Sequence, residues 1–133
     1  MASITPDEGE KLIADLVVKN SSVDRGTNLQ LGLFTNSSVG ETTTLGGITE
    51  PTGGGYARKT LTDASWTGTG ATRSYALQTF TATGSAYTGT IYGYFIATTG
   101  TTPRLLALET DPISSFTMLV NDTYDVTPNI TVS

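Results

Sequence analysis

The stretch TIYGYFIATTG, residues 90–100, is the most apolar run in the chain, and it decides the fold class. With the two-residue period of a β-strand, one face carries Ile91, Gly93, Phe95 and Ala97, and the opposite face carries Tyr92, Tyr94 and Ile96. Because neither face is polar, we expect this strand near the middle of a sheet, with a sandwich core on one side. The other side needs a cover, for which the N-terminal helix and a second copy of the chain are the two candidates. A glycine within such a strand is expected to let a ring or a neighbouring backbone approach closely.

The composition favours a mainly β protein. Thr makes up about a fifth of the 133 residues, and charged residues make up 14%, below the usual share of about a quarter. Further strands are expected at residues 29–35, 56–62, 65–69, 73–83, 104–110, 116–122 and 124–133, with turn signals at the spacing of roughly 8 to 12 residues that is typical of sandwiches. We therefore expect a mainly β fold, an antiparallel β-sandwich of jelly-roll-like type with one N-terminal α-helix.

The helix is predicted by the segment TPDEGEKLIADLVVK, residues 5–19. Thr5 is expected as the N-cap, Pro6 at the first helical position and Glu8 as its capping-box partner. The acidic residues of the first turn are favoured there by the helix dipole. We therefore predict a helix over residues 6–19, within an N-terminal helix and linker at residues 1–28 that precede the sandwich at residues 29–133 in a single domain.

One apolar stripe runs along the predicted helix, and it consists of Leu12, Ile13, Leu16 and Val17. Burial of four such side chains contributes on the order of 6 to 12 kcal/mol as an upper estimate, so the helix is expected to dock. It docks either on its own domain or on a partner subunit. We predict these four residues, together with Trp66, Tyr92 and Tyr94, as candidates for a partner interface.

The charge and the missing residue types argue against several classes of function. The formal net charge is −5, and the chain contains neither His nor Cys, the side chains on which neutral-pH catalysis and zinc sites most often depend. Only seven residues are basic, which disfavours binding to a phosphate backbone. No apolar run reaches the roughly 20 residues that span a bilayer. We expect a protein that is not an enzyme, with no cofactor or metal and no nucleic-acid or membrane partner.

Two motifs have structural interpretations that are simpler than their chemical ones. The segment GGGYARKT, residues 53–60, lacks the Gly-Lys pair of a phosphate-binding loop and is expected to be a loop that leads into a strand. The carboxylate pair of Glu8 and Glu10 is expected to serve the helix dipole, and the pair of Asp122 and Asp125 to serve a turn. The Thr- and Gly-rich segment 36–55 is expected to form a long surface loop, a class of loop that is often functional.

Several of these segments, taken in order, resemble a family of small structural proteins of tailed bacteriophages. The resemblance covers residues 29–133, and its most specific parts are GGGYARKTL, IYGYF and VTPNITVS. It implies a protein of the virion, and members of the family are head decoration, cement or minor tail proteins. No catalytic motif accompanies it.

The resemblance leads to two hypotheses. The first is a capsid cement or decoration protein that is made in the host cytoplasm, binds the major capsid protein on the outer surface of the head and forms a homo-oligomer, a dimer or a trimer. The second is a tail-fibre or adhesin module whose 35–55 loop binds a host receptor, such as a glycan that contacts Trp66 or the tyrosines. An enzyme such as a depolymerase would require convergent carboxylates that the sequence does not display.

Overall fold

The computed structural model describes residues 3–111 and 115–132, so Ser133 of the last predicted strand lies outside it. Its largest sheet has the order β2-β1-β6-β7 and contains β1 (Leu29–Phe34), β2 (Lys59–Leu61), β6 (Gly93–Ala97) and β7 (Leu105–Thr110). Three ribbons pair β3 (Thr72–Ser74) with β10 (Asn129–Thr131), β4 (Gln78–Thr81) with β9 (Thr123–Val126), and β5 (Thr90–Ile91) with β8 (Phe116–Thr117). All pairings are antiparallel, and with the N-terminal α-helix α1 (Asp7–Val18) they confirm the predicted fold class.

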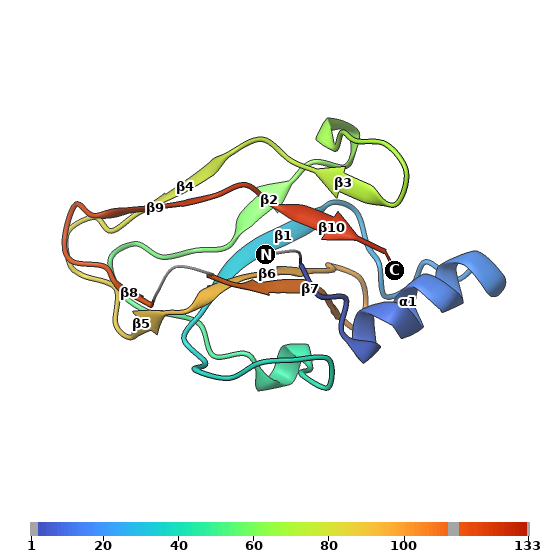
Figure 1. Ribbon diagram of the computed structural model, residues 1–133, viewed down its shortest axis with the longest axis horizontal. Helices are drawn as coiled ribbons and strands as arrows, with labels where there is room; N and C mark the ends of the chain where they lie inside the picture. The colour runs from blue at the N-terminus through green and yellow to red at the C-terminus, as the bar shows by residue number, and fades with distance from the viewer. Residues whose placement is uncertain (1–2, 112–114, 133) are drawn as a thin grey trace.

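Two layers enclose the main core. Figure 1 shows the ribbons β3–β10 and β4–β9 lying over β1, β6 and β7, with α1 at one end of the molecule. Side chains from both layers are fully or almost fully buried between them, among them Leu31, Leu33, Ile96, Phe80 and Val126. The second layer therefore consists of short ribbons that share one apolar core with a continuous sheet.

The other face of the sheet is covered by the loop at residues 35–55 and by the N-terminal segment. A second cluster on this face consists of Phe34, Phe95, Ala97, Leu105 and Leu108, against which Val39, Leu45, Ile48 and Ile4 pack. A short 3₁₀ helix, Leu45–Gly47, lies within the loop. The loop therefore covers the face of the sheet for which the sequence predicted either the N-terminal helix or a second copy as the cover. The apolar residues of this loop are scattered and do not form a periodic pattern, so the sequence did not indicate this role.

The strand predicted within residues 90–100 is interrupted at Tyr92, which separates β5 from β6. Tyr92 packs on the outer face with Phe95, whereas Ile91 lies in the main core with Tyr94 and Ile96. One irregular residue shifts the alternation by one position, so the predicted grouping of Ile91 with Phe95 is wrong. The backbone of Tyr92 still bonds to Phe34 in β1 and to Asp111, which directly follows β7.

Other strand boundaries differ from the sequence prediction in the same way. Residues 65–69 contribute one bridge, between Thr67 and Ser74, and residues 73–83 divide into β3 and β4. The last predicted strand divides at residues 127–128 into β9 and β10, as expected for a proline that cannot donate to a ladder. Short strands with frequent glycine and threonine do not carry enough periodicity to fix such breaks.

Candidate binding surfaces

The apolar stripe of α1 is divided between the core and the solvent. Leu12 is buried in the main core, and Ile13 and Leu16 pack partly buried against it. Val17 is 77% exposed. The helix approaches β7 closely because Gly9 has no side chain: a Cβ there would lie 2.6 Å from the Leu106 carbonyl oxygen. The helix therefore docks on its own domain and leaves one predicted interface residue free.

An apolar groove runs along the outer side of α1. It has a volume of about 420 Å³ and is lined by Thr5, Glu10, Ile13, Ala14, Val17, Val18 and Val132. Val18 is 82% exposed, and Val132 at the C-terminal end is also exposed. The sequence analysis missed both of these valines, because the helical stripe alone does not indicate that the C-terminal segment lies beside it.

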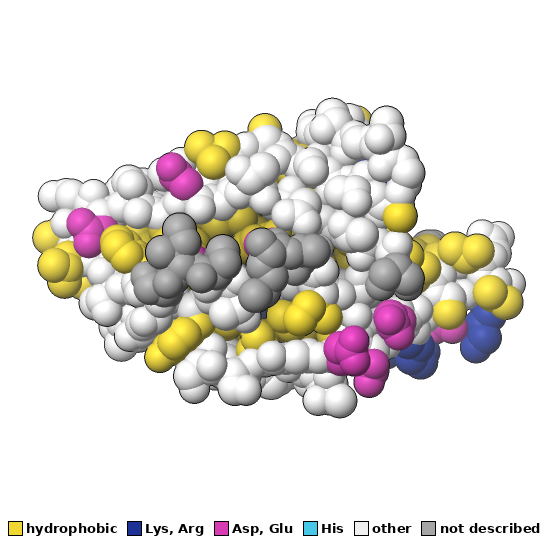
Figure 2. Space-filling model, in the orientation of Figure 1, with side chains coloured by type: hydrophobic (Ala, Val, Ile, Leu, Met, Phe, Trp, Pro, Cys, Tyr) yellow, Lys and Arg dark blue, Asp and Glu magenta, His cyan; other side chains and the backbone are white. Residues whose placement is uncertain are grey.

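A second exposed apolar surface lies at the opposite end of the molecule. It consists of Phe116 in β8 and of Leu119 and Val120 at the turn into β9, and Leu119 is 61% exposed. In Figure 2, hydrophobic side chains gather at both ends of the long axis, over α1 on the right and over the turn before β9 on the left. We call the residues that line the groove along α1 the α1 surface, and we call Phe116, Leu119 and Val120 the β9-turn surface.

Trp66 lies at the opening of the main core near α1. It follows the 3₁₀ turn Asp63–Ser65, and its ring meets that of Tyr75 edge-on, with centroids 5.3 Å apart and planes 67° apart. The ring is half-buried against the main core and lines a cavity of about 400 Å³. Its Nε1–H is buried and has no hydrogen-bond partner among the described residues.

Tyr94 is a core residue that links the two layers. It is 7% exposed, and its hydroxyl donates to Glu109 Oε2 at 2.8 Å and accepts from the Asn129 backbone N–H at 3.3 Å. Burial, with the Glu109 carboxylate second, raises the pKa of Tyr94 well above its ordinary value. Tyr92 is half-buried under the 35–55 loop. Neither tyrosine lies on the α1 surface or on the β9-turn surface.

Carboxylates of β7 and β9 line a small polar cleft of about 240 Å³. The Tyr124 hydroxyl donates to Asp111 Oδ2 at 2.6 Å, and Thr79 donates to Asp125 at 2.6 Å, so these carboxylates act as hydrogen-bond acceptors. As predicted, Asp122 serves a turn, where it accepts from the Leu119 backbone N–H, whereas Asp125, for which the same role was predicted, lies in β9. Within residues 3–111 and 115–132, no group of three or more acidic residues is arranged to hold a metal ion.

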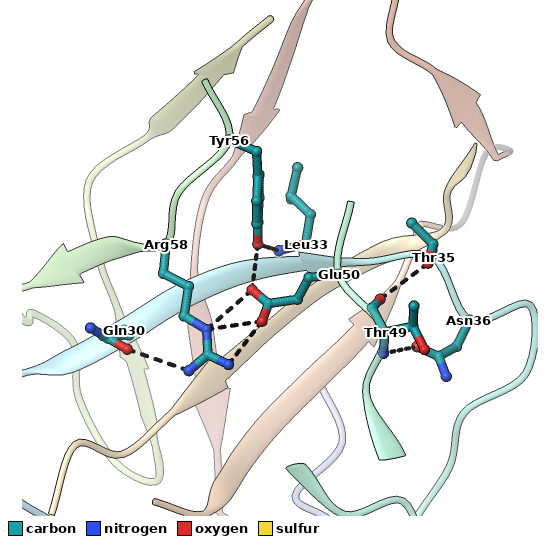
Figure 3. A network of polar contacts seen from close by, with 8 residues as sticks. All are labelled: Gln30, Leu33, Thr35, Asn36, Thr49, Glu50, Tyr56 and Arg58. Atoms are coloured by element: carbon teal, nitrogen blue, oxygen red, sulfur yellow. Dashed lines mark hydrogen bonds and ion pairs between the residues drawn. The ribbon is translucent and has the colours of Figure 1, made fainter. Parts of the chain in front are cut away.

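Arg58 of the GGGYARKT segment forms an ion pair with Glu50 of the 35–55 loop. Arg58 donates to both carboxylate oxygens of Glu50, with distances of 2.9 to 3.2 Å, and its guanidinium lies over the Phe95 ring. Tyr56 donates to Glu50 Oε1 at 2.7 Å and accepts from the Leu33 backbone N–H at 2.9 Å (Figure 3). The hydrogen bond to Glu50 raises the pKa of the Arg58 guanidinium, and burial raises that of Tyr56. The motif thus anchors the 35–55 loop to β1.

Comparison of the chain with known protein families, with curated proteins and with solved structures found no match. No helix in the described part of the chain combines the length and the apolar character needed to cross a bilayer. The surfaces that the fold leaves exposed are therefore the basis for a functional proposal.

Proposed function

We propose that the chain is a structural protein of a tailed-bacteriophage particle, a cement or decoration protein of the head. It binds the major capsid protein on the outer surface of the assembled shell, associates there with further copies of itself and adds contact area between capsomers. It works by binding, without catalytic turnover. The segments GGGYARKTL, IYGYF and VTPNITVS support the placement in a virion through their resemblance to such proteins.

The observation that carries the proposal is the pair of exposed apolar surfaces at opposite ends of the molecule. A protein that bridges two neighbours needs two separate contact sites, and the α1 surface and the β9-turn surface supply them. Full burial of one aliphatic side chain of this size contributes about 1.5–3 kcal/mol. Even a small contact of this kind, repeated over many copies, stabilises the assembled state because it binds that state only.

The architecture between the two surfaces supports a bridging role. The sheet is buried on both faces, and the 35–55 loop is held to it by the Arg58–Glu50 ion pair. Two sites on such a packed body keep a fixed separation, because close-packed interiors have low compressibility. A fixed separation is what a shell of regularly spaced subunits requires.

The copy number of the chain in purified virions tests the proposal. Quantitative mass spectrometry is expected to find hundreds of copies per particle, which is the stoichiometry of a shell component. A handful of copies would contradict the cement role and favour the tail-fibre or adhesin hypothesis.

Attachment to shells that lack the protein tests the two surfaces. We expect Val17→Asp and Leu119→Asp each to reduce binding to such shells by about tenfold or more, because each buries a charge at an apolar contact. Val23→Asp is the matched control, since Val23 is 61% exposed and lies outside both surfaces. Circular dichroism verifies that each variant is folded. Undiminished attachment of both surface variants would contradict the proposal.

A further inference from the structure

The two layers of the fold leave an opening at the end that carries α1. The cavity of about 400 Å³ at this opening lies between the start of β1, represented by Leu29, and the ribbon β3–β10, represented by Arg73 and Ile130. Cavities of roughly 300–1,000 Å³ are of the size that binds small ligands. The proposed shell contacts use Val132, which also lines this cavity, but they use neither Arg73 nor Trp66.

The strand register brings an arginine and the only tryptophan of the chain to the same cavity. Arg73 is paired with Ile130 across the ribbon, and Thr67 is bridged to Ser74, which sets Trp66 opposite Tyr75. Residues directly opposite each other in a ribbon share a face, so Arg73 lies on the same face as Ile130. Ile130 packs partly buried against the main core, so this face is directed toward the core.

The charge of the cavity is positive in a protein whose net charge is −5. Arg25 is paired with Asp63 at 2.8 Å, and both residues line the cavity. Arg73 donates through Nη1 to the backbone oxygens of Gly70 and Thr72, and it has no ion-pair partner within the described part of the chain. Its remaining guanidinium donors suit a carboxylate, which arginine binds in a two-pronged geometry.

The other residues that line the cavity suit a ligand with a non-polar face and with hydroxyl groups. Leu29, Ile130, Val132 and the ring of Trp66 supply apolar surface, which suits a flat non-polar face. The Asp63 carboxylate at the same cavity can accept hydrogen bonds from hydroxyl groups.

We propose that this cavity binds an acidic sugar, a ring that carries a carboxylate, of the class of the uronic acids. The carboxylate pairs with Arg73, the non-polar face of the ring lies against Trp66, and hydroxyl groups bond to Asp63. This inference does not depend on the shell function, because Arg73 and Trp66 lie outside both the α1 surface and the β9-turn surface, and the ligand has a different chemistry.

Titration of the free protein with D-glucuronate tests this assignment. Because the chain has one tryptophan, its indole fluorescence and its indole N–H resonance both report on this cavity alone. We expect a saturable change in both signals. Arg73→Gln is expected to weaken the binding by about tenfold or more, since a charge-assisted pair is lost. Arg73 is exposed, so its replacement leaves the core intact.

The controls separate the parts of the proposal. Lys19→Gln removes a positive charge from an exposed side chain outside the cavity and is expected to leave the affinity unchanged. Glucose, which lacks the carboxylate, and benzoate, which lacks the hydroxyl groups, are expected to bind more weakly than glucuronate. No saturable change, equal binding of either control ligand, or equal affinity in Arg73→Gln would overturn the assignment. None of these outcomes changes the expected attachment to shells.

Discussion

Gly93 occupies a position where two strands and a ring leave no room for a side chain. A Cβ at this position would overlap the carbonyl oxygen of Glu109 and come within 2.8 Å of the Phe34 ring. The glycine in IYGYF was predicted to allow the close approach of a ring or a backbone, and both are found. At Gly32 the corresponding space is filled by the Phe95 ring. The missing side chains at Gly93 and Gly32 thus leave room for the Phe34 and Phe95 rings on the outer face of the sheet.

We predict that Gly93→Ala destabilises the protein by about 1–3 kcal/mol, the typical cost of inserting a methyl group into a packed interior. The nearest atom is a backbone oxygen on a paired strand, which cannot move aside without breaking the ladder. Urea unfolding curves provide the measurement. Gly40→Ala is the control, because nothing lies within 4 Å of a Cβ built at Gly40. Equal midpoints for the two variants would refute this account.

At the scale of elements, the attachment of α1 depends on one carboxylate. Glu8 Oε2 accepts the backbone N–H of Leu45 in the loop at 3.0 Å and that of Leu105 in β7 at 2.6 Å. Its other oxygen lies 3.6 Å from Arg104. A single side chain in the first turn of the helix therefore joins the helix, the loop and the edge of the sheet.

We predict that Glu8→Ala lowers the free energy of unfolding by about 2–5 kcal/mol, because two backbone donors lose their acceptor and each costs about 1–3 kcal/mol when it is left unsatisfied. Glu10→Ala is the matched control, two positions along the same turn, at an exposed side chain, and its effect is expected to stay within about 0.5 kcal/mol. Thermal unfolding followed by circular dichroism measures both. A similar loss in the two variants would assign the effect to the helix dipole instead.

The role of Glu8 also shows where sequence reasoning at this scale stops. The Thr-x-x-Glu pattern correctly predicted a helix start, but the helix N-cap is Pro6 and no side chain caps it. Thr5 instead donates to the carbonyl oxygen of Thr131 at 3.1 Å. Local patterns fix the existence of a helix because its periodicity is local. They do not indicate which distant donors compete for the same side chains.

At the scale of the whole molecule, the cover of the sheet and the exposed surfaces result from packing between distant segments. Two neighbouring apolar residues of α1 differ in exposure, because Leu16 packs against the core and Val17 faces solvent. The strands β1 and β7 could be predicted from their own alternation and apolar character. The Trp66 cavity could not, because its walls come from segments about 40 to 60 residues apart whose proximity depends on the ribbon register.

The layers are also held together by tyrosines whose hydroxyl groups bond to carboxylates. Tyr56 bonds to Glu50, Tyr94 to Glu109 and Tyr124 to Asp111. In all three cases burial is the largest cause that raises the pKa of the phenol above its ordinary value of 10.0, and the nearby carboxylate raises it further. The folded protein therefore retains protons that the unfolded chain releases at alkaline pH.

This difference predicts how stability depends on pH. Below about pH 9 the phenols are protonated in both states, so their contribution is fully present. As the pH rises above about 10, the unfolded chain loses these protons and the folded protein does not, so the free energy of unfolding falls. Urea unfolding at a series of pH values from neutral to alkaline measures this decline.

Substitution of Tyr56 by phenylalanine separates the titration from the packing. Tyr56→Phe retains the ring stacked on Phe80 but removes one titrating group, so we expect lower stability at neutral pH, by about 1–3 kcal/mol, and a shallower decline above pH 10. Tyr92→Phe removes a hydroxyl that has no hydrogen-bond partner within residues 3–111 and 115–132, and it serves as the control. If Tyr56→Phe left the alkaline slope unchanged, the decline would have to come from groups other than Tyr56, and the predicted contribution of this phenol would be wrong.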